Sequence, residues 1–257
     1  MPCFKIIYSD GNIGGFGLGI DDKIRRLRLD NIEVYDNKIK NFEKVFFNDF
    51  KTDYTLKKLR KKQIEWSCKV KLEDSIDKID TIAGFDVAYP QNDFDNCCAA
   101  CIVMDNKTKK VIEEKIIHDK NFFPYIPTYL TFREADFYQL LYEQLENKPD
   151  VLMIDGNGIL HPFGLGIASF IGVKMNIQSI GVAKSKLCGK LEGDKVIFDN
   201  KLIGSAFFSS KYIKNPIFVS PGHKISHNTS ISIIDEYCYY KITEPIRKAN
   251  LLATKNI

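Results

Sequence analysis

Residues 151–158 read Val-Leu-Met-Ile-Asp-Gly-Asn-Gly, so that four apolar residues are followed abruptly by a carboxylate and a glycine. An apolar run without helical spacing is typical of a strand buried on both faces, as in the middle of a parallel or mixed sheet. α/β enzymes place their chemistry where such strands end. In isolation Asp155 would be read as a turn residue that caps the next helix. Its neighbours in the sequence make it a candidate for chemistry instead.

The segments around this run predict an α/β fold with a mixed sheet flanked by helices. Three strands precede it, joined by short turns, and should form an antiparallel meander. A helix follows them before the central strand, and more strands and helices come after it. The expected strands are 4–8, 81–89, 97–104, 111–118, 151–155, 178–182, a hairpin over 196–208 and 217–220, and the expected helices are 131–146, 163–173, 227–239 and 244–254.

Residues 1–54 form an N-terminal extension to which the sequence assigns no role, and 55–257 form the main domain. The glycine-rich stretch 14–19 lacks the Lys-Ser/Thr of a P-loop and does not match the dinucleotide fingerprint, which favours an ordinary loop. Residues 23–50 are predicted to be a small β-rich or helical appendage. Residues 55–72 predict a helix with one basic face, which fits either a solvated surface or a contact with a polyanion.

Composition sets broad limits on the class of protein. The net charge of +4 over 257 residues permits a nucleic-acid partner without indicating one. Neither a membrane span nor a signal-peptide core is evident. The seven cysteines have no framework spacing, and Cys97, Cys98 and Cys101 are expected to be buried thiols rather than zinc ligands. A reducing compartment is expected, the cytoplasm or, in a eukaryote, the nucleus, and a monomer.

Three carboxylates have placements that suggest a metal site. Asp86 interrupts an apolar strand, which is costly unless the charge is paired or binds a metal. Glu134 is expected in the first turn of a helix, where the helix dipole alone could explain it. Asp155 ends the central strand. Together these placements resemble the way in which a ribonuclease H-like sheet gathers acidic residues, and they predict a site for a hard cation such as Mg²⁺.

Six blocks of sequence in the main domain give the chain a specific resemblance to a known family. Over 55–254 the chain resembles endonuclease V in six ordered blocks: Ile82 to Val87; Pro124-Tyr125-Ile126-Pro127 with Phe132-Arg133-Glu134; Asp155 to Gly158 with His161-Pro162; Gly181 to Lys184; Ser220 to Ser226; and Glu244 to Arg247.

The resemblance implies a DNA-repair or RNA-processing nuclease. That family cleaves inosine-containing nucleic acid at the second phosphodiester bond on the 3′ side of the inosine, with Mg²⁺ or Mn²⁺, and 5′-phosphate ends are expected. Asp86 and Asp155 would be the main metal ligands, and Glu134 would complete the site. Lys184 would offset charge on the phosphate, and His223 would orient or deprotonate water or contact phosphate.

The resemblance also implies a nucleic-acid-binding loop and a base pocket. Tyr125 would wedge into the nucleic acid from a loop stiffened by Pro124 and Pro127, with Ile126 beside it. Inosine would sit against backbone groups at positions where side chains are absent. The residues expected there are Gly84, Gly156, Asn157 and Gly158, with His161 nearby in a less defined role.

Two departures and two rival readings remain. Phe163 and Phe170 stand where the family often has a basic residue and a histidine, which could weaken phosphate contact or change the preferred strand. The sequence of residues 155–161 resembles family members that act on inosine in RNA as much as those that act on DNA. A general structure-selective nuclease would cut regardless of inosine. A non-catalytic nucleic-acid-binding protein would not need clustered carboxylates beside a phosphate.

Overall fold

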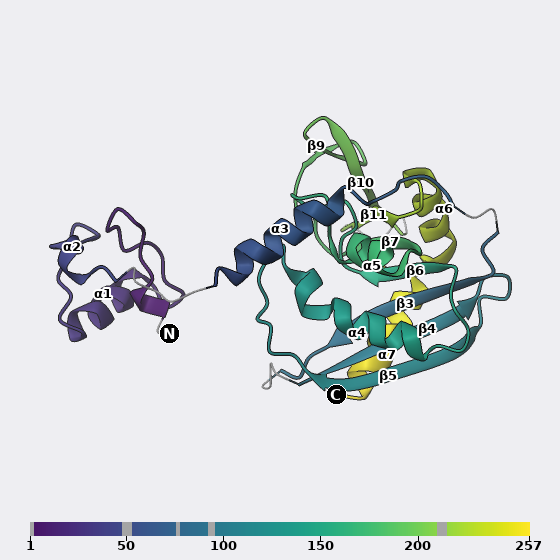
Figure 1. Cartoon of the computed structure of the whole chain (residues 1–257), viewed down its shortest axis with the longest axis horizontal. Helices are drawn as coiled ribbons and strands as arrows, with labels where there is room; N and C mark the ends of the chain where they lie inside the picture. The colour runs from purple at the N-terminus through teal and green to yellow at the C-terminus, as the bar shows by residue number, and fades with distance from the viewer. Residues whose placement is uncertain (1–2, 48–52, 76–77, 92–95, 210–214) are drawn as a thin grey trace. The chain divides into compact units, whose positions relative to one another are not determined.

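The computed structural model describes residues 3–47, 53–75, 78–91, 96–209 and 215–257, and it divides into two compact units, Met1–Tyr54 and Thr55–Ile257 (Figure 1). Within these residues, no helix combines the length and apolar character needed to cross a bilayer.

The smaller unit packs three short helices and a two-stranded hairpin around a few apolar side chains. These elements are η1 (Cys3–Lys5), α1 (Ile20–Leu29), β1 (Val34–Tyr35), β2 (Lys38–Ile39) and α2 (Phe42–Val45). The strand predicted over 4–8 is wrong, since the chain there begins with a 3-10 helix. Residues 14–19 form a loop, as predicted, and the buried Lys23 donates to the carbonyls of Ile6 and Gly15 (2.7 and 3.2 Å) and of Ile13. The loop therefore turns carbonyl groups towards an internal cation.

The larger unit is built on a nine-stranded mixed sheet in the order β5-β4-β3-β6-β7-β11-β10-β9-β8. The predicted antiparallel meander is confirmed as β3 (Thr81–Ala88), β4 (Asn96–Asp105) and β5 (Val111–Lys120). The central strand β6 (Val151–Asp155) runs parallel to β3 and to β7 (Gln178–Ala183), while β11 (Ile217–His223) is antiparallel to β7. The hairpin of β9 (Lys195–Phe198) and β10 (Lys201–Phe207) is confirmed, and β8 (Lys190–Glu192) extends it.

Helices cover both faces of this sheet. On one face α4 (Leu130–Gln144) and α5 (Ile167–Met175) bury Phe85, Leu152 and Ile154, and α3 (Thr55–Ser67) packs beside them through Trp66. On the other face α6 (His227–Tyr237) and α7 (Glu244–Lys255) cover Ile82 and Met153. The period-two alternation of the strands between these two cores explains why β6 is apolar at every position up to Asp155.

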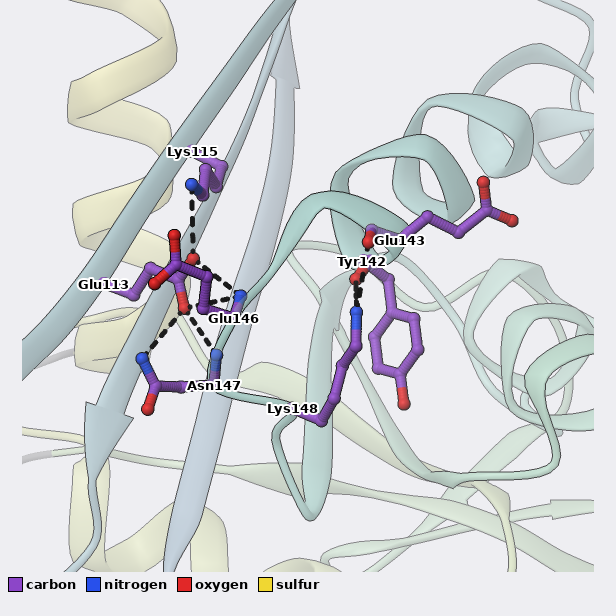
Figure 2. Close-up of polar contacts among 7 residues, drawn as sticks. All are labelled: Glu113, Lys115, Tyr142, Glu143, Glu146, Asn147 and Lys148. Atoms are coloured by element: carbon purple, nitrogen blue, oxygen red, sulfur yellow. Dashed lines mark hydrogen bonds and ion pairs between the residues drawn. The ribbon is translucent and has the colours of Figure 1, made fainter.

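The turn from α4 to β6 is fastened to β5, the edge strand of the sheet, by a carboxylate (Figure 2). Glu113 on β5 accepts hydrogen bonds from the backbone N–H groups of Glu146 and Asn147 (3.0 and 2.8 Å) and pairs with Lys115 (3.4 Å). Lys148 donates to the last carbonyls of α4, including that of Tyr142 at 2.6 Å. These contacts fix where β6 enters the sheet, and so where Asp155 ends it.

Candidate active site

The parallel pairing of β3 with β6 brings two of the predicted carboxylates together. Phe85 pairs with Ile154, so the residues that follow, Asp86 and Asp155, are neighbours on the same face of the sheet. On the other side of β6, Asp155 pairs with Val182. Lys184 comes two residues later, and its Nζ donates to Asp155 Oδ2 at 2.7 Å. Three adjacent strands thus place two carboxylates and one ammonium at one end of the sheet.

Asp86 is buried, with 6% of its surface exposed. Burial and, next, the negative charge of Asp155 raise the pKa of Asp86 to about 7. The hydrogen bond from Nδ2 of Asn250 on α7 to Asp86 Oδ2 (2.7 Å) opposes the shift most, followed by the charge of Lys184 and the backbone N–H of Val87. Asn250 was missed by the sequence analysis, because a single polar residue on a partly exposed helix gives no signal of what it reaches.

Glu134 is the third carboxylate, and two tyrosines hold it. It is the fifth residue of α4, beyond the first turn, so the helix dipole does not account for its position. Its oxygens accept hydrogen bonds from the hydroxyls of Tyr89 (3.1 Å) and Tyr138 (3.3 Å). Burial raises the pKa of Glu134 to about 8, with further contributions from Asp86 and Asp155, although the bond from Tyr89 opposes them.

Lys184 balances only part of this negative charge. Burial works against its ammonium, but the ion pair with Asp155, followed by Asp86 and Glu134, raises the pKa of Lys184 above its ordinary value. One lysine therefore partly balances the charge of three nearby carboxyl groups, those of Asp155, Asp86 and Glu134. A divalent cation would offset the burial and the repulsion that together raise the pKa values of Asp86 and Glu134.

The chemistry of these donors fits Mg²⁺ better than a softer metal. Across the described ranges, no three His, Cys, Asp or Glu side chains converge on a ready-made metal site. Mg²⁺ does not require one, because it commonly keeps several waters and takes one or two carboxylates together with substrate phosphate oxygens. Asp86 and Asp155, adjacent on neighbouring strands, meet that description. The cysteines at 97, 98 and 101 are buried free thiols on β4, as expected.

His223 is not brought to the carboxylates. It pairs with Ser179 near the start of β7, whereas Asp155 pairs with Val182 near the end of β7 and Lys184 follows that end. Its Nδ1 accepts a hydrogen bond from the backbone N–H of Lys71 (3.2 Å), and burial lowers its pKa to about 4. The geometry therefore gives no support to a role in orienting or deprotonating water. His223 instead tethers the segment after α3 to β11.

The space beside the Cα atoms of the glycines expected near the base is filled by other parts of the protein. A Cβ at Gly84 would lie 2.1 Å from the backbone carbon of Pro245, so this glycine lets α7 approach β3. Gly158 would meet the Pro221 carbonyl at 2.1 Å, and Gly156, at φ 147°, would meet the Ile167 side chain at 2.5 Å. These positions serve close packing of the loop after β6. Whether their backbone groups also line a pocket for the inosine base stays a prediction.

A small cavity of about 60 Å³ lies instead between the 124–129 loop and the start of α5. Its lining includes Tyr125, Thr128, Asn157, His161 and Leu187. The side chain of Tyr125 is 70% exposed, as expected of a residue that inserts into a partner. Asn157 Oδ1 is buried without a hydrogen-bond partner, which is unusual for a carbonyl oxygen. The buried His161 is directed to protein groups: its Nε2 lies 3.1 Å from the Thr128 carbonyl.

The 124–129 loop is also linked to the carboxylates. Asn121, just before it, donates to the Tyr89 hydroxyl (2.8 Å) and to the carbonyl of Arg133 (2.9 Å). Tyr89 in turn donates to Glu134. These hydrogen bonds tie the segment that leads into the loop to Glu134 in the acidic cluster.

Comparison with known proteins identifies the family. A family model described as Endonuclease V matches residues 64–251. A bifunctional methyltransferase/endonuclease of Picrophilus torridus is 37% identical over 234 residues, which cover 91% of this chain and 73% of that protein. Endonuclease V of Thermofilum pendens is 36% identical, over 79% of this chain and 89% of its own length.

A solved structure supports the same assignment. A variant of Endonuclease V of Ciona intestinalis, crystallised with a 23mer DNA containing an inosine followed by a ribo-adenosine, superposes with a TM-score of 0.72 at 29% identity, covering 80% of this chain and 98% of that one. The expected ribonuclease H-like fold is confirmed by this likeness. The chain belongs to the endonuclease V family, and it is a nuclease that hydrolyses phosphodiester bonds.

Proposed function

We propose that this chain cuts inosine-containing nucleic acid at the second phosphodiester bond on the 3′ side of the inosine, using Mg²⁺, for which Mn²⁺ can substitute. The observation that carries the proposal is that Asp86 and Asp155 directly follow the paired residues Phe85 and Ile154 on adjacent strands, with Lys184 against Asp155. The inosine-containing DNA in the related Ciona structure supports the choice of substrate.

Asp86 and Asp155 would hold the cation, which would polarise the scissile phosphate and favour deprotonation of the attacking water. Asn250 orients Asp86 through its hydrogen bond to Oδ2. Lys184 is placed to stabilise negative charge that develops on the phosphate once Asp155 is engaged elsewhere. Glu134, held by Tyr89 and Tyr138, would complete the site for the cation, directly or through water, once the bound charge lets it ionise. The proposed products carry a 5′-phosphate and a 3′-hydroxyl.

The inosine base would be received at the cavity beside Tyr125. A base that leaves the stack needs a replacement for its stacking partner, and the exposed Tyr125 ring on its proline-flanked loop can supply it. Hypoxanthine carries a hydrogen on N1, which adenine lacks. We assign the unpartnered Oδ1 of Asn157 as the acceptor for that hydrogen, because a buried acceptor without a partner is costly until a ligand satisfies it.

The smaller unit is given no part in cleavage. The match to the Picrophilus protein spans more of this chain than residues 55–257 contain, so it must include roughly 30 residues of 1–54. We propose that this unit belongs to the architecture of those bifunctional relatives rather than to the nuclease.

For the whole chain we propose a monomer. Six described free cysteines suit a reducing compartment such as the cytoplasm.

The test compares matched single-stranded DNA and RNA oligonucleotides, each with one inosine, in Mg²⁺, with inosine-free strands and the Asp155→Ala variant as controls. Product mapping should place the cut at the second phosphodiester bond on the 3′ side of the inosine. The strand that is cleaved faster, DNA or RNA, identifies the preferred substrate. Cutting that ignores inosine would favour a general nuclease, and binding without cutting in either metal would favour a non-catalytic binding protein.

A further inference from the structure

The residue Thr128 closes the 124–129 loop in a backbone conformation that threonine rarely adopts. Its φ of 71° lies in the left-handed region, where a β-branched side chain is unfavourable. Strain of this kind persists only where surrounding groups impose it, and it is often found at functional loops. The groups that impose it here come from α3 and from the loop after β6.

Arg60 on α3 is the first of these groups. Its guanidinium lies between two aromatic rings, 4.1 Å from the centroid of Tyr129 and 3.9 Å from that of Phe163. Nη2 donates to Thr128 Oγ1 at 2.6 Å, and Nη1 donates to Gln63 Oε1 at 2.5 Å. A planar guanidinium can stack on two faces and donate in its plane at once, which an ammonium cannot do.

Gln63 and His161 both form hydrogen bonds with the backbone carbonyl of Thr128. Gln63 is fully buried, and its Nε2 donates to the carbonyls of Thr128 (3.1 Å) and Leu165 (2.7 Å), which uses both of its hydrogens. His161 Nδ1 accepts from the backbone N–H of Phe163 (3.2 Å), so the proton of the neutral ring is on Nε2 and is donated to the Thr128 carbonyl. Thr128 therefore receives hydrogen bonds from three side chains.

We infer that Arg60, together with Gln63 and His161, locks Thr128 and thereby holds the 124–129 loop in the conformation from which Tyr125 enters the nucleic acid. The inference rests on the proposed function and adds to it a positioning role for α3. It also accounts for Phe163: this ring forms one wall of the Arg60 sandwich. Arg60 does not touch the reacting atoms, so it acts through Tyr125.

The test is a double-mutant cycle on kcat/KM for a single-stranded inosine oligonucleotide. Arg60→Ala should lower kcat/KM at least tenfold. Arg60→Lys should fail to rescue it, because the charge is kept while the stacking and the in-plane hydrogen bonds are lost. Lys61→Ala removes a charge from an exposed position of the same helix, where its side chain is 80% exposed, and should stay within twofold of the wild-type protein.

Tyr125→Ala completes the cycle. If Arg60 acts through Tyr125, the double variant should be no worse than Tyr125→Ala alone, whereas a separate structural contribution would multiply the two losses. A second readout does not depend on cleavage: in an Asp155→Asn background, 2-aminopurine placed beside the inosine should brighten on binding, and Arg60→Ala should reduce that brightening as Tyr125→Ala does.

Multiplicative losses, or an Arg60→Ala variant that behaves like Lys61→Ala, would overturn the inference. Thermal unfolding of each variant shows whether it is folded. If Arg60→Ala does not fold, Arg60→Lys takes its place in the cycle, and the same two outcomes decide. Absence of inosine-dependent cleavage by the wild-type protein would instead count against the proposed function.

Discussion

Glu134 illustrates how a single buried carboxylate ties stability to function. Its pKa of about 8 in the folded protein lies above its ordinary value of 4.5. The unfolded chain loses this proton as pH rises past 4.5, while the folded chain keeps it until about 8. Folding without metal therefore becomes less favourable as pH rises through this window, and the loss levels off above it.

We predict that Glu134→Gln unfolds at a higher temperature than the wild-type protein in EDTA, by a margin that grows from pH 5 to pH 8 and is then constant. Its nuclease activity should fall sharply. Glu143→Gln is the matched control, because Glu143 is an exposed carboxylate on the same helix, where it accepts a hydrogen bond from Gln139. Calorimetry at several pH values measures the margin, and a margin that is flat or shrinks with pH would contradict the assignment of a proton to Glu134.

Asn157 differs from Glu134 because its buried Oδ1 has no hydrogen-bond partner in the free protein. Asn157→Leu should leave the unfolding temperature unchanged or slightly raised, because Oδ1 has no partner to lose. Loss of one hydrogen bond to the base should cost about 1–3 kcal/mol, which is roughly a 5- to 150-fold lower kcat/KM on inosine strands. Unchanged kinetics in Asn157→Leu would remove this residue from the base site.

At the scale of single elements, the sequence was most informative where a periodicity was long and unbroken. The meander and β6 follow from apolar runs bounded by turn residues, and the last two helices follow from helical spacing. The strand expected over 4–8 failed because an apolar alternation becomes a strand only when a partner is available. The three residues of β8 are all exposed, so they carry no burial pattern to detect.

The candidate site divides in the same way. Asp86 and Asp155 were predictable, because each breaks or ends an apolar run and a parallel pairing brings them together. Asn250, Arg60 and Gln63 were not, since a polar residue on a helix looks the same whether it faces water or a neighbouring loop. The glycines were seen as special, but whether a ligand or a helix fills the space depends on tertiary packing alone.

The Glu113 contact makes a testable claim about how β6 is anchored. Burial alone would raise its pKa, yet the hydrogen bonds from Glu146 and Asn147 hold that pKa at about 2. The carboxylate therefore stabilises the fold fully above about pH 4.5, and this contribution disappears as pH falls towards 2. Glu113→Gln should lower the free energy of unfolding by about 2 kcal/mol at neutral pH.

Urea denaturation measures this loss, and Glu114→Gln is the control, because Glu114 is exposed on the same strand. The wild-type and Glu113→Gln proteins should converge in stability near pH 2. Equal stability of the two Gln variants at pH 7 would mean that the turn after α4 is held without the charge.

At the scale of the whole molecule, the two compact units make cleavage separable from the N-terminal extension. Residues 55–257 contain the complete mixed sheet, both layers of helices and every residue assigned to the site. A chain beginning at Thr55 should therefore fold and cut inosine strands with a kcat/KM within about threefold of the full chain. A loss greater than tenfold, in a truncated chain with an unchanged far-ultraviolet circular dichroism spectrum for this unit, would show that residues 1–54 take part.

In the proposed reaction, the neighbouring carboxylates Asp86 and Asp155, beside Lys184, direct cleavage at a fixed distance from an inosine that Tyr125 helps to extrude. The most direct measurement is product mapping on one end-labelled strand with a single inosine, in Mg²⁺, for the wild-type, Asp155→Ala and Tyr125→Ala proteins. We predict one product, cut at the second linkage 3′ to the inosine, absent with Asp155→Ala and strongly reduced with Tyr125→Ala. Cleavage at many positions, independent of the inosine and of Tyr125, would contradict it.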